Sequence, residues 1–167
     1  MPRKPSTTHP PARNPRPSRR IHEDRQGNGK LPELACCPSC RASYRAGRWT
    51  WQTAPVDAYQ RTCPACERIE SGYPAGVLQV AGDFAVTHRD DLIGLIRNVE
   101  ERERSTHPLK RVMAIADEGA GFSVSVTDAK LVDAMGRALK HAYAGHLEHP
   151  PTTSDKENLV RARWSRD

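Results

Sequence analysis

Apolar residues recur with strand periodicity at four places in the C-terminal part of the chain. AGVLQVAGDFAV (75–86) is rich in β-branched residues and predicts a strand or hairpin. LKRVMAIA (109–116) and FSVSV (122–126) flank the turn sequence DEGAG, which predicts a hairpin. LVRARW (159–164) alternates apolar and polar residues, as expected for a half-buried strand.

Two amphipathic helices are predicted between these strands. Thr87 has the features of an N-cap, with Asp90 at the capping-box position, and Pro108 follows the helix. The second helix is expected to begin at Thr127 and to stop at Gly145. The apolar faces are Leu92, Leu95, Ile96 and Val99 in the first helix, and Leu131, Met135, Ala138, Leu139 and Ala142 in the second.

The resulting order, βαββαβ, is that of the ferredoxin-like split arrangement, in which two helices cover one face of a four-stranded antiparallel sheet. The predicted fold class is therefore α+β. Composition divides the chain into a Pro/Arg-rich tail (1–30), a cysteine-containing segment (31–74) and the ferredoxin-like domain (75–167). The low mean hydropathy of −0.74 indicates that part of the chain is not packed, and the tail is expected to be disordered.

Four of the five cysteines form two Cys-Pro-x-Cys pairs, Cys37 with Cys40 and Cys63 with Cys66. Two residues between thiols allow one tight turn to aim both sulfurs at a single point, and two such turns supply four ligands to a tetrahedral ion. The spacing predicts a structural zinc ribbon, with a hairpin between the pairs. Because four thiolates leave no open coordination position, a catalytic metal is not expected.

Two alternatives to zinc stay open from the ligands alone. Iron of the rubredoxin type uses similar cysteine turns. A thioredoxin-like redox pair would place one Cys-x-x-Cys at the start of a helix after a strand, and the two symmetric pairs disfavour it. Cys36 does not fit the double pattern without displacing Cys37, so we interpret it as a spare thiol beside the site.

The formal charge of +6 resides in the tail. Residues 1–30 carry eight Lys and Arg against two acidic residues, whereas the remainder of the chain is formally neutral. Such an arm suits a polyanion such as RNA, and a merely solubilising extension is the alternative. The tail lacks the apolar stretch of a secretory signal, and its prolines prevent the amphipathic helix of a mitochondrial address. A cytoplasmic location is expected, with no membrane contact, because no apolar run approaches bilayer length.

Basic and aromatic residues lie between the cysteine pairs. They predict a surface that contacts RNA, although packing of at least one tryptophan is the favoured alternative. The last strand adds two outward-facing arginines. The candidate nucleic-acid contacts are Arg41, Arg45, Arg48, Trp49, Trp51, Arg161 and Arg163.

No catalytic motif stands out in the sequence. GNGK (27–30) lacks the upstream glycine and the following Ser or Thr of a phosphate-binding loop. His141, His146 and His149 lie near a helix end at spacings that do not align metal ligands on one face. Neither an enzyme activity nor a small-molecule substrate is therefore predicted, although catalytic groups can lie far apart in a sequence.

The segments CPSCRASYRAGRWTW, CPACERIESGYPAG, HPLKRVM and VRARWSRD resemble an uncharacterised bacterial zinc-ribbon family with a C-terminal α+β domain, over residues 34–167. The double-CPxC region is also remotely similar to the zinc region of the large-ribosomal-subunit export adaptor family. That second resemblance implies binding to RNA or ribosomes without catalysis. The leading hypothesis is a non-enzymatic zinc protein that binds RNA or ribosomes through tail and ribbon. The alternatives are a protein-interaction adaptor and an enzyme with a structural zinc.

Overall fold

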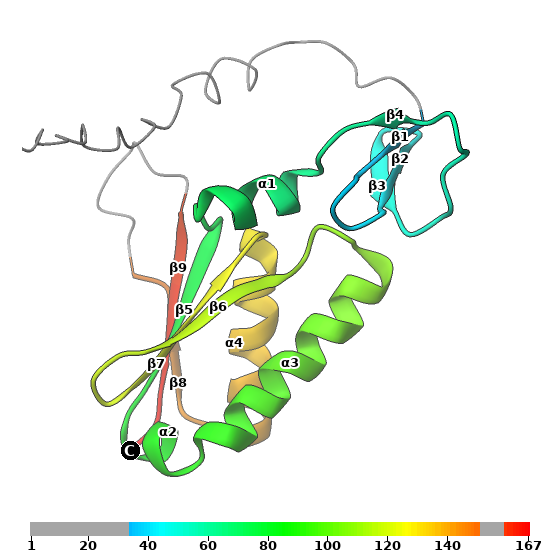
Figure 1. Cartoon of the computed structure of the whole chain (residues 1–167). Coiled ribbons are helices and arrows are strands. Elements are labelled where there is room, and N and C mark those ends of the chain that lie inside the picture. Colours follow the sequence, from blue (N-terminus) through cyan, green and yellow to red (C-terminus); the bar gives the residue numbers. More distant parts are fainter. Residues whose placement is uncertain (1–33, 151–158) are drawn as a thin grey trace, which may run out of the picture. The chain divides into compact units, whose positions relative to one another are not determined.

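The structure, a computed structural model, describes residues 34–150 and 159–167 (Figure 1). The basic tail expected at residues 1–30 lies outside the described residues, and so does most of the polar loop before the last strand. The described chain contains two β-sheets and four helices, so the prediction of an α+β fold is confirmed. None of the helices in these two ranges is long and apolar enough to cross a bilayer.

The first sheet belongs to the cysteine-containing segment. It has the order β3-β2-β1-β4, from β1 (Ala35–Cys36), β2 (Ser43–Arg45), β3 (Arg48–Thr50) and β4 (Tyr59–Gln60). β1 pairs antiparallel with β2 and parallel with β4, while β2 and β3 form the hairpin expected between the cysteine pairs. Helix α1 (Pro64–Ser71) follows β4. We call residues 34–74 the ribbon.

The ribbon has a small core because its strands are only two or three residues long. Four of the six buried side chains that form this core belong to three cysteines and one tryptophan, and the other two are alanines. Tyr44 packs against them at the edge, with its ring centroid 5.6 Å from that of Trp49. A core this small contributes little hydrophobic stabilisation, so the fold of the ribbon depends on its cysteines.

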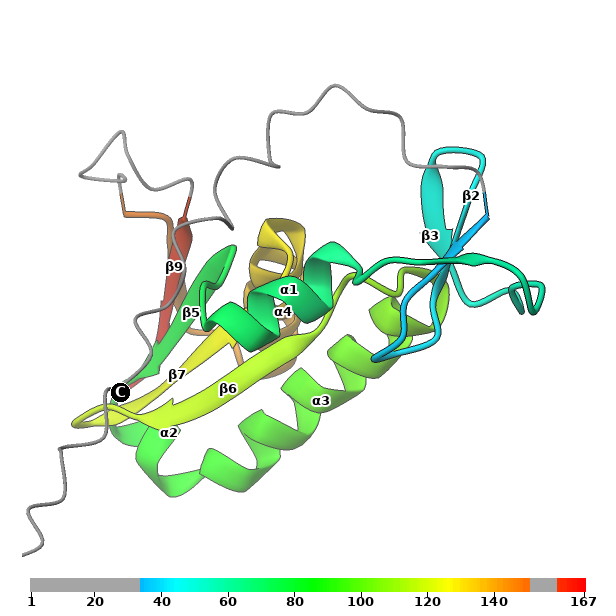
Figure 2. The same ribbon diagram turned by 45° about the horizontal axis from the view of Figure 1, so that its top comes forward.

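Residues 75–167 contain the second sheet and the helices after α1, and together with the ribbon they belong to one compact unit. We call residues 75–167 the α+β domain. In chain order its elements are β5 (Gly76–Ala81), α2 (Asp83–Thr87), α3 (Arg89–Thr106), β6 (Val112–Asp117), β7 (Gly121–Val126), α4 (Ala129–Tyr143), β8 (His146–Glu148) and β9 (Val160–Ser165). The sheet order is β6-β7-β5-β9-β8. Figure 2 shows β6 and β7 side by side as the predicted hairpin.

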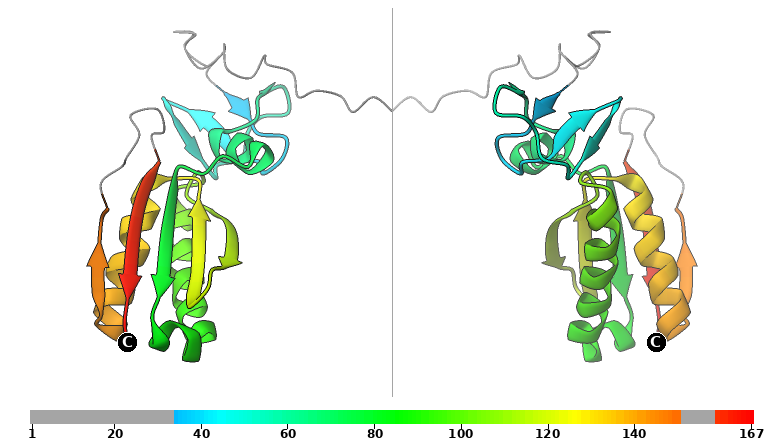
Figure 3. Two further views of the ribbon diagram at one scale, coloured as in Figure 1. Left: turned by 90° about the vertical axis from the view of Figure 1, so that its left-hand side faces the viewer. Right: turned by 90° about the vertical axis from the view of Figure 1, so that its right-hand side faces the viewer.

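Helices α3 and α4 lie side by side against one face of this sheet (Figure 3). Alternate strand residues point into the core between the two layers, among them Leu78, Val124 and Trp164. The predicted apolar faces supply the helical side of the core: Leu92, Ile96, Val99, Leu131, Met135 and Leu139 are buried. Ala142 is exposed, so it is not part of the buried face of α4 as predicted, and Tyr143 packs against the core in that turn instead.

The predicted ferredoxin-like topology needs correction. Its last strand should run antiparallel to the first, but β9 pairs parallel with β5 along its whole length. The reason is the additional strand β8, which pairs antiparallel with β9 and reverses the chain before β9 begins. β8 has only three residues, of which two are polar and exposed, so its periodicity was too short to predict a strand. The sheet is therefore mixed and five-stranded.

Both predicted helix starts shift. Thr87 ends the short helix α2, where its hydroxyl donates to the Asp83 carbonyl at 2.7 Å, and His88 precedes α3. Asp128 caps α4, its carboxylate accepting from the Lys130 N–H at 2.8 Å. Thr127, directly after β7, instead connects to the segment before β6, because its hydroxyl donates to the Leu109 carbonyl at 2.6 Å. Asp and Thr are both good N-caps, so sequence alone does not choose between neighbours.

Candidate metal centre

The first cysteine pair lies in a tight turn directly after β1. The Arg41 N–H donates to the Cys37 carbonyl at 2.8 Å, and the Cys37 N–H donates to the Ala42 carbonyl at 2.8 Å. Arg41 has a φ of 67°, which lets the chain turn back immediately after Cys40. This turn holds both thiols on its inner side.

The second pair opens helix α1. Cys63 is the N-cap, Pro64 occupies the first helical turn and Cys66 is buried in that turn. Sequence reasoning missed this helix, although a proline one residue after a candidate cap is a known helix-start signal. The helix N-terminus also favours negative charge on the two sulfurs.

The four sulfur atoms of Cys37, Cys40, Cys63 and Cys66 lie within 4.8 Å of one another. The Cys40 and Cys63 sulfurs are 3.7 Å apart, far beyond the roughly 2.05 Å of a disulfide. A tetrahedron with zinc–sulfur bonds of about 2.3 Å has edges of about 3.8 Å. The four cysteines thus form a cluster that could bind a metal ion such as zinc.

Hydrogen bonds and burial shift the pKa values of the thiols of this cluster in opposite directions. Burial raises the pKa of the Cys37 thiol, but the backbone N–H groups of Cys63, Cys40 and Ser39 outweigh it and bring the pKa down to about 7. Burial raises the pKa of Cys63 well above its ordinary value, and neighbouring thiolates raise it further. Cys66 is also raised in pKa, mainly by burial. A bound cation offsets the repulsion between neighbouring thiolates, so metal binding and ionisation of the thiols occur together.

A buried arginine from the α+β domain contacts the cluster. The Arg111 guanidinium donates from Nη1 to the Cys66 sulfur at 3.4 Å. Burial lowers the pKa of Arg111, but the Cys40 and Cys66 sulfurs raise it by a larger amount, so Arg111 stays charged. A buried cation needs a negative counterpart. This contact fits a cluster of thiolates around a metal better than four neutral thiols.

Cys36 is not a member of the cluster. It lies in β1, buried, and its thiol is 3.9 Å from the Cys37 carbonyl. Cys36 is the last residue of β1, and its sulfur is not among the four that cluster. Within residues 34–150 and 159–167, the four clustered cysteines are the one set of three or more Cys, His or acidic side chains close enough to share an ion. His141, His146 and His149 form no such set.

The two tryptophans of the ribbon are both engaged within the chain. Trp49 is only 9% exposed and packs in the ribbon core, which confirms that at least one tryptophan is used for packing. Trp51 is 38% exposed, and its indole N–H donates to the Arg104 carbonyl at 2.6 Å. Arg104 and Arg111 both lie over its ring, each with the guanidinium carbon 5.7 Å from the centroid. Because Trp49 is buried, it has no free face on which a base could stack.

The five candidate arginines lie in two places that the structure does not bring into one site. Arg41 and Arg48 are exposed and Arg45 is half-buried in the ribbon. Arg161 and Arg163 point outward from β9, on the sheet face opposite α3 and α4. Their role as nucleic-acid contacts stays a prediction.

In comparisons with known proteins, no family model, no curated protein and no solved structure matches this chain. Both family resemblances drawn from the sequence therefore stay predictions. The function has to be inferred from the residues of the site.

Proposed function

We propose that this protein is a non-enzymatic zinc-binding protein that associates with RNA through its ribbon and its basic N-terminal segment. Zinc would be held by Cys37, Cys40, Cys63 and Cys66, and its chemistry there is structural, because four thiolates occupy every position of a tetrahedral ion. The clustered sulfurs support the metal site. The proposed RNA contact rests on an arginine pair in the hairpin β2–β3.

Arg45 and Arg48 are direct cross-strand partners in this hairpin. Like charges directly opposite each other destabilise a strand pair unless an anion lies between them. Neither arginine forms an ion pair with a carboxylate in the described part of the chain. The Arg45 Nε is buried and has no hydrogen-bond partner there, while its Nη2 donates to the Thr53 carbonyl at 3.3 Å. A phosphate between the two guanidinium groups would offset their like charges.

A two-residue turn joins this pair. Ala46 and Gly47 are the two residues between the strands, with φ of 47° and 80°, as in the tight turns that match strand twist. Both arginines are thus presented at the tip of the ribbon. Phosphate contact of this kind does not read base identity, so the expected binding is independent of sequence.

A protein-binding adaptor is the second candidate. Six of the seven well-exposed large apolar or aromatic side chains in the described residues belong to the ribbon, namely Leu34, Trp51, Val56, Tyr59, Ile69 and Tyr73. Such a concentration of apolar surface is typical of a docking surface. Tyr59 is also compatible with stacking on a base, so exposure alone does not decide between the two partners.

The proposal is tested with the full zinc-loaded chain and a fluorescent 20-nucleotide single-stranded RNA, by anisotropy at several salt concentrations. The double variant Arg45→Gln/Arg48→Gln is expected to bind more weakly. Its dependence of log K on log salt should be shallower by about 0.7 for each lost phosphate contact. Removal of residues 1–30, which carry the net positive charge, should weaken binding further.

The matched control is Arg137→Gln/Lys140→Gln, which removes two exposed charges from α4 and should leave the salt dependence unchanged. Absence of salt-dependent RNA binding in the wild-type chain would contradict the RNA part of the proposal. A defined protein partner that co-purifies after nuclease treatment, and is lost with Tyr59→Ala, would establish the adaptor instead. Zinc content is measured separately by mass spectrometry of the purified protein.

A further inference from the structure

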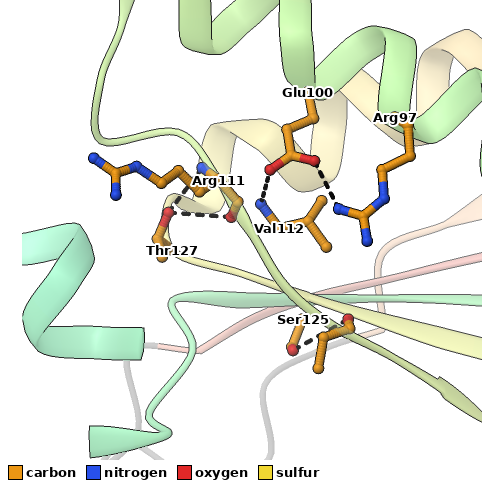
Figure 4. Close-up of polar contacts among 7 residues, drawn as sticks. Arg97, Glu100, Arg111, Val112, Ser125 and Thr127 are labelled. Carbon is orange, nitrogen blue, oxygen red and sulfur yellow. Dashed lines mark hydrogen bonds and ion pairs between the residues drawn. The ribbon is translucent and has the colours of Figure 1, made fainter. Parts of the chain in front are cut away.

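Arg111 is fixed by backbone hydrogen bonds at the point where the α+β domain begins its hairpin. Its N–H donates to the Thr127 hydroxyl at 2.9 Å, and its carbonyl accepts from the Thr127 N–H at 3.0 Å. Figure 4 shows the Thr127 hydroxyl bonded to both the N–H and the carbonyl of Arg111, and the guanidinium extending away from them. The backbone of Arg111 thus belongs to the α+β domain, whereas its side chain contacts the ribbon.

The guanidinium is held in one orientation. Its Nε donates to the Pro108 carbonyl at 2.7 Å, and its Nη1 donates to the Cys66 sulfur at 3.4 Å. Its Nη2 is buried and has no hydrogen-bond partner within the described residues. The whole residue is only 7% exposed, which is unusual for arginine.

The charge of Arg111 has no carboxylate counterpart among the ion pairs of the described chain. Burial of an unpaired guanidinium is strongly unfavourable. The groups beside it that can carry negative charge are the cysteine sulfurs. Four thiolates around Zn²⁺ have a net charge of −2, and one adjacent cation offsets half of it. Hydrogen-bond donors beside metal ligands also increase metal affinity, and the Arg111 guanidinium is such a donor to Cys66.

Trp51 closes this contact from the ribbon side. The guanidinium carbons of Arg111 and Arg104 each lie 5.7 Å from the centroid of its ring. Arg104 differs from Arg111 in that it is exposed and forms no hydrogen bond to sulfur. Substitutions of Arg104 and Arg111 can therefore be compared to separate the effect of stacking on Trp51 from the effect of contact with the metal centre.

We propose that Arg111 is a positioning residue of the metal centre, which donates to Cys66, offsets the charge of the metal-bound thiolates and couples metal binding to docking of the ribbon on the α+β domain. The inference rests on the zinc-binding part of the proposed function and is independent of RNA. It assigns part of the metal site to a residue 45 positions beyond the last cysteine.

The test compares full-length Arg111→Met, Arg111→Lys and Arg111→Gln with the control Arg104→Met. Zinc affinity is measured by competition with a chelator of known affinity, and Co²⁺ is used as a spectroscopic substitute. Arg111→Met should bind zinc about 10–100-fold more weakly. Arg104→Met should stay within about twofold of the wild-type affinity, because the Arg104 guanidinium lies over Trp51 and donates to no cysteine sulfur. Arg111→Lys should fall between them, since it keeps the charge but loses the fork of donors.

The cobalt spectrum reports on the sulfur directly. Loss of a donor raises the energy of the thiolate electrons, so the sulfur-to-cobalt charge-transfer band of Arg111→Met should move to longer wavelength, and that of Arg104→Met should not. A merely structural role would leave the band in place. On removal of zinc from the wild-type chain, amide exchange at residues 109–112 should accelerate together with exchange in the ribbon.

Equal zinc affinities for Arg111→Met and Arg104→Met, or an unshifted cobalt band in Arg111→Met, would overturn the inference. If Arg111→Met retains no metal at all, the comparison of Arg111→Lys with Arg111→Gln decides: tighter binding by the lysine variant supports charge compensation, and equal binding refutes it. A wild-type chain that binds neither zinc nor cobalt refutes the proposed function itself, which is a different outcome.

Discussion

Cys36 and Cys37 are adjacent and of the same type, but only Cys37 belongs to the sulfur cluster. Cys37 points into the cluster, and its sulfur accepts the Cys63 N–H at 3.3 Å. The Cys36 sulfur lies outside the cluster. Cys63→Ser should abolish stoichiometric zinc binding, whereas Cys36→Ser should keep it. Metal analysis of the purified variants measures this, and loss of zinc from Cys36→Ser would show that the assignment of ligands is wrong.

At Gly82, the backbone leaves no room for a Cβ atom. Its φ is 102°, and a Cβ added there would collide with the backbone carbonyl of Arg166. Gly82→Ala should lower the free energy of unfolding by about 1–3 kcal/mol, because neither the strain nor the collision can relax through a side chain. Urea unfolding followed by circular dichroism measures the change.

Gly94 is the matched control for Gly82. It lies inside α3, where an added Cβ meets nothing within 4 Å. Gly94→Ala should stabilise the protein by about 0.5–1 kcal/mol through helix propensity. Equal effects of the two substitutions would show that the close approach of Gly82 to Arg166 does not matter for stability.

At the scale of elements, α3 is joined to the edge strand β6 by a buried carboxylate. Glu100 accepts the Val112 N–H at 2.7 Å and Arg97 at 2.9 Å (Figure 4). Glu100→Ala leaves the Val112 N–H without this acceptor and should cost about 1–3 kcal/mol of unfolding free energy. Glu101→Ala, one residue on and exposed, should change stability by less than about 0.5 kcal/mol in the same urea experiment.

The end of α3 is tied to the following loop by a pH-sensitive pair. Lys110 donates to Glu103 at 2.6 Å and lowers the pKa of this carboxyl below its ordinary value, against a smaller opposing effect of burial. The pair therefore stabilises the fold fully above the ordinary carboxyl pKa of 4.5 and is lost as pH falls through the lower folded pKa.

Glu103→Gln tests this pH dependence. The wild-type chain should be more stable than the variant by up to about 1 kcal/mol at pH 6, and the gap should narrow as pH falls below 4.5. Acid also protonates cysteine ligands, but it does so in both proteins, so the gap isolates the carboxyl. Glu101→Gln, which removes an exposed carboxyl of the same helix, is the matched control. A constant gap for Glu103→Gln would mean that the contribution of the residue is not electrostatic.

Long periodic elements were predictable from sequence, and short ones were not. The four apolar stretches and both apolar helix faces carry a core pattern over several residues, so the sequence predicts β5, β6, β7, β9, α3 and α4. β8 and α2, with three and five residues, contain less than two helical turns or strand periods. The cysteine spacing identified the cluster, because covalent geometry restricts it. Arg111 gave no signal, since the contact depends on tertiary packing.

At the scale of the whole molecule, the two cores differ in what stabilises them. The α+β domain buries fifteen residues, among them large ones such as Trp164 and Phe122, whereas the ribbon core holds six. Removal of zinc by a chelator should therefore unfold the ribbon and leave the α+β core folded. The indole N–H of Trp51 should lose protection from hydrogen exchange, while that of Trp164, which donates to the Ala144 carbonyl at 2.8 Å, should keep it. Simultaneous loss at both would show a single cooperative unit.

The central position of β9 has a consequence for the order of folding during synthesis. β9 lies between β5 and β8 in the sheet, yet it is translated after every strand that it joins. Until residue 160 has been made, β5 has an unpaired edge and the core lacks Trp164. The ribbon, whose contacts are local in sequence, can acquire its ion while translation continues. Metal loading can therefore precede closure of the sheet, and the nascent α+β domain is the segment that needs protection from aggregation.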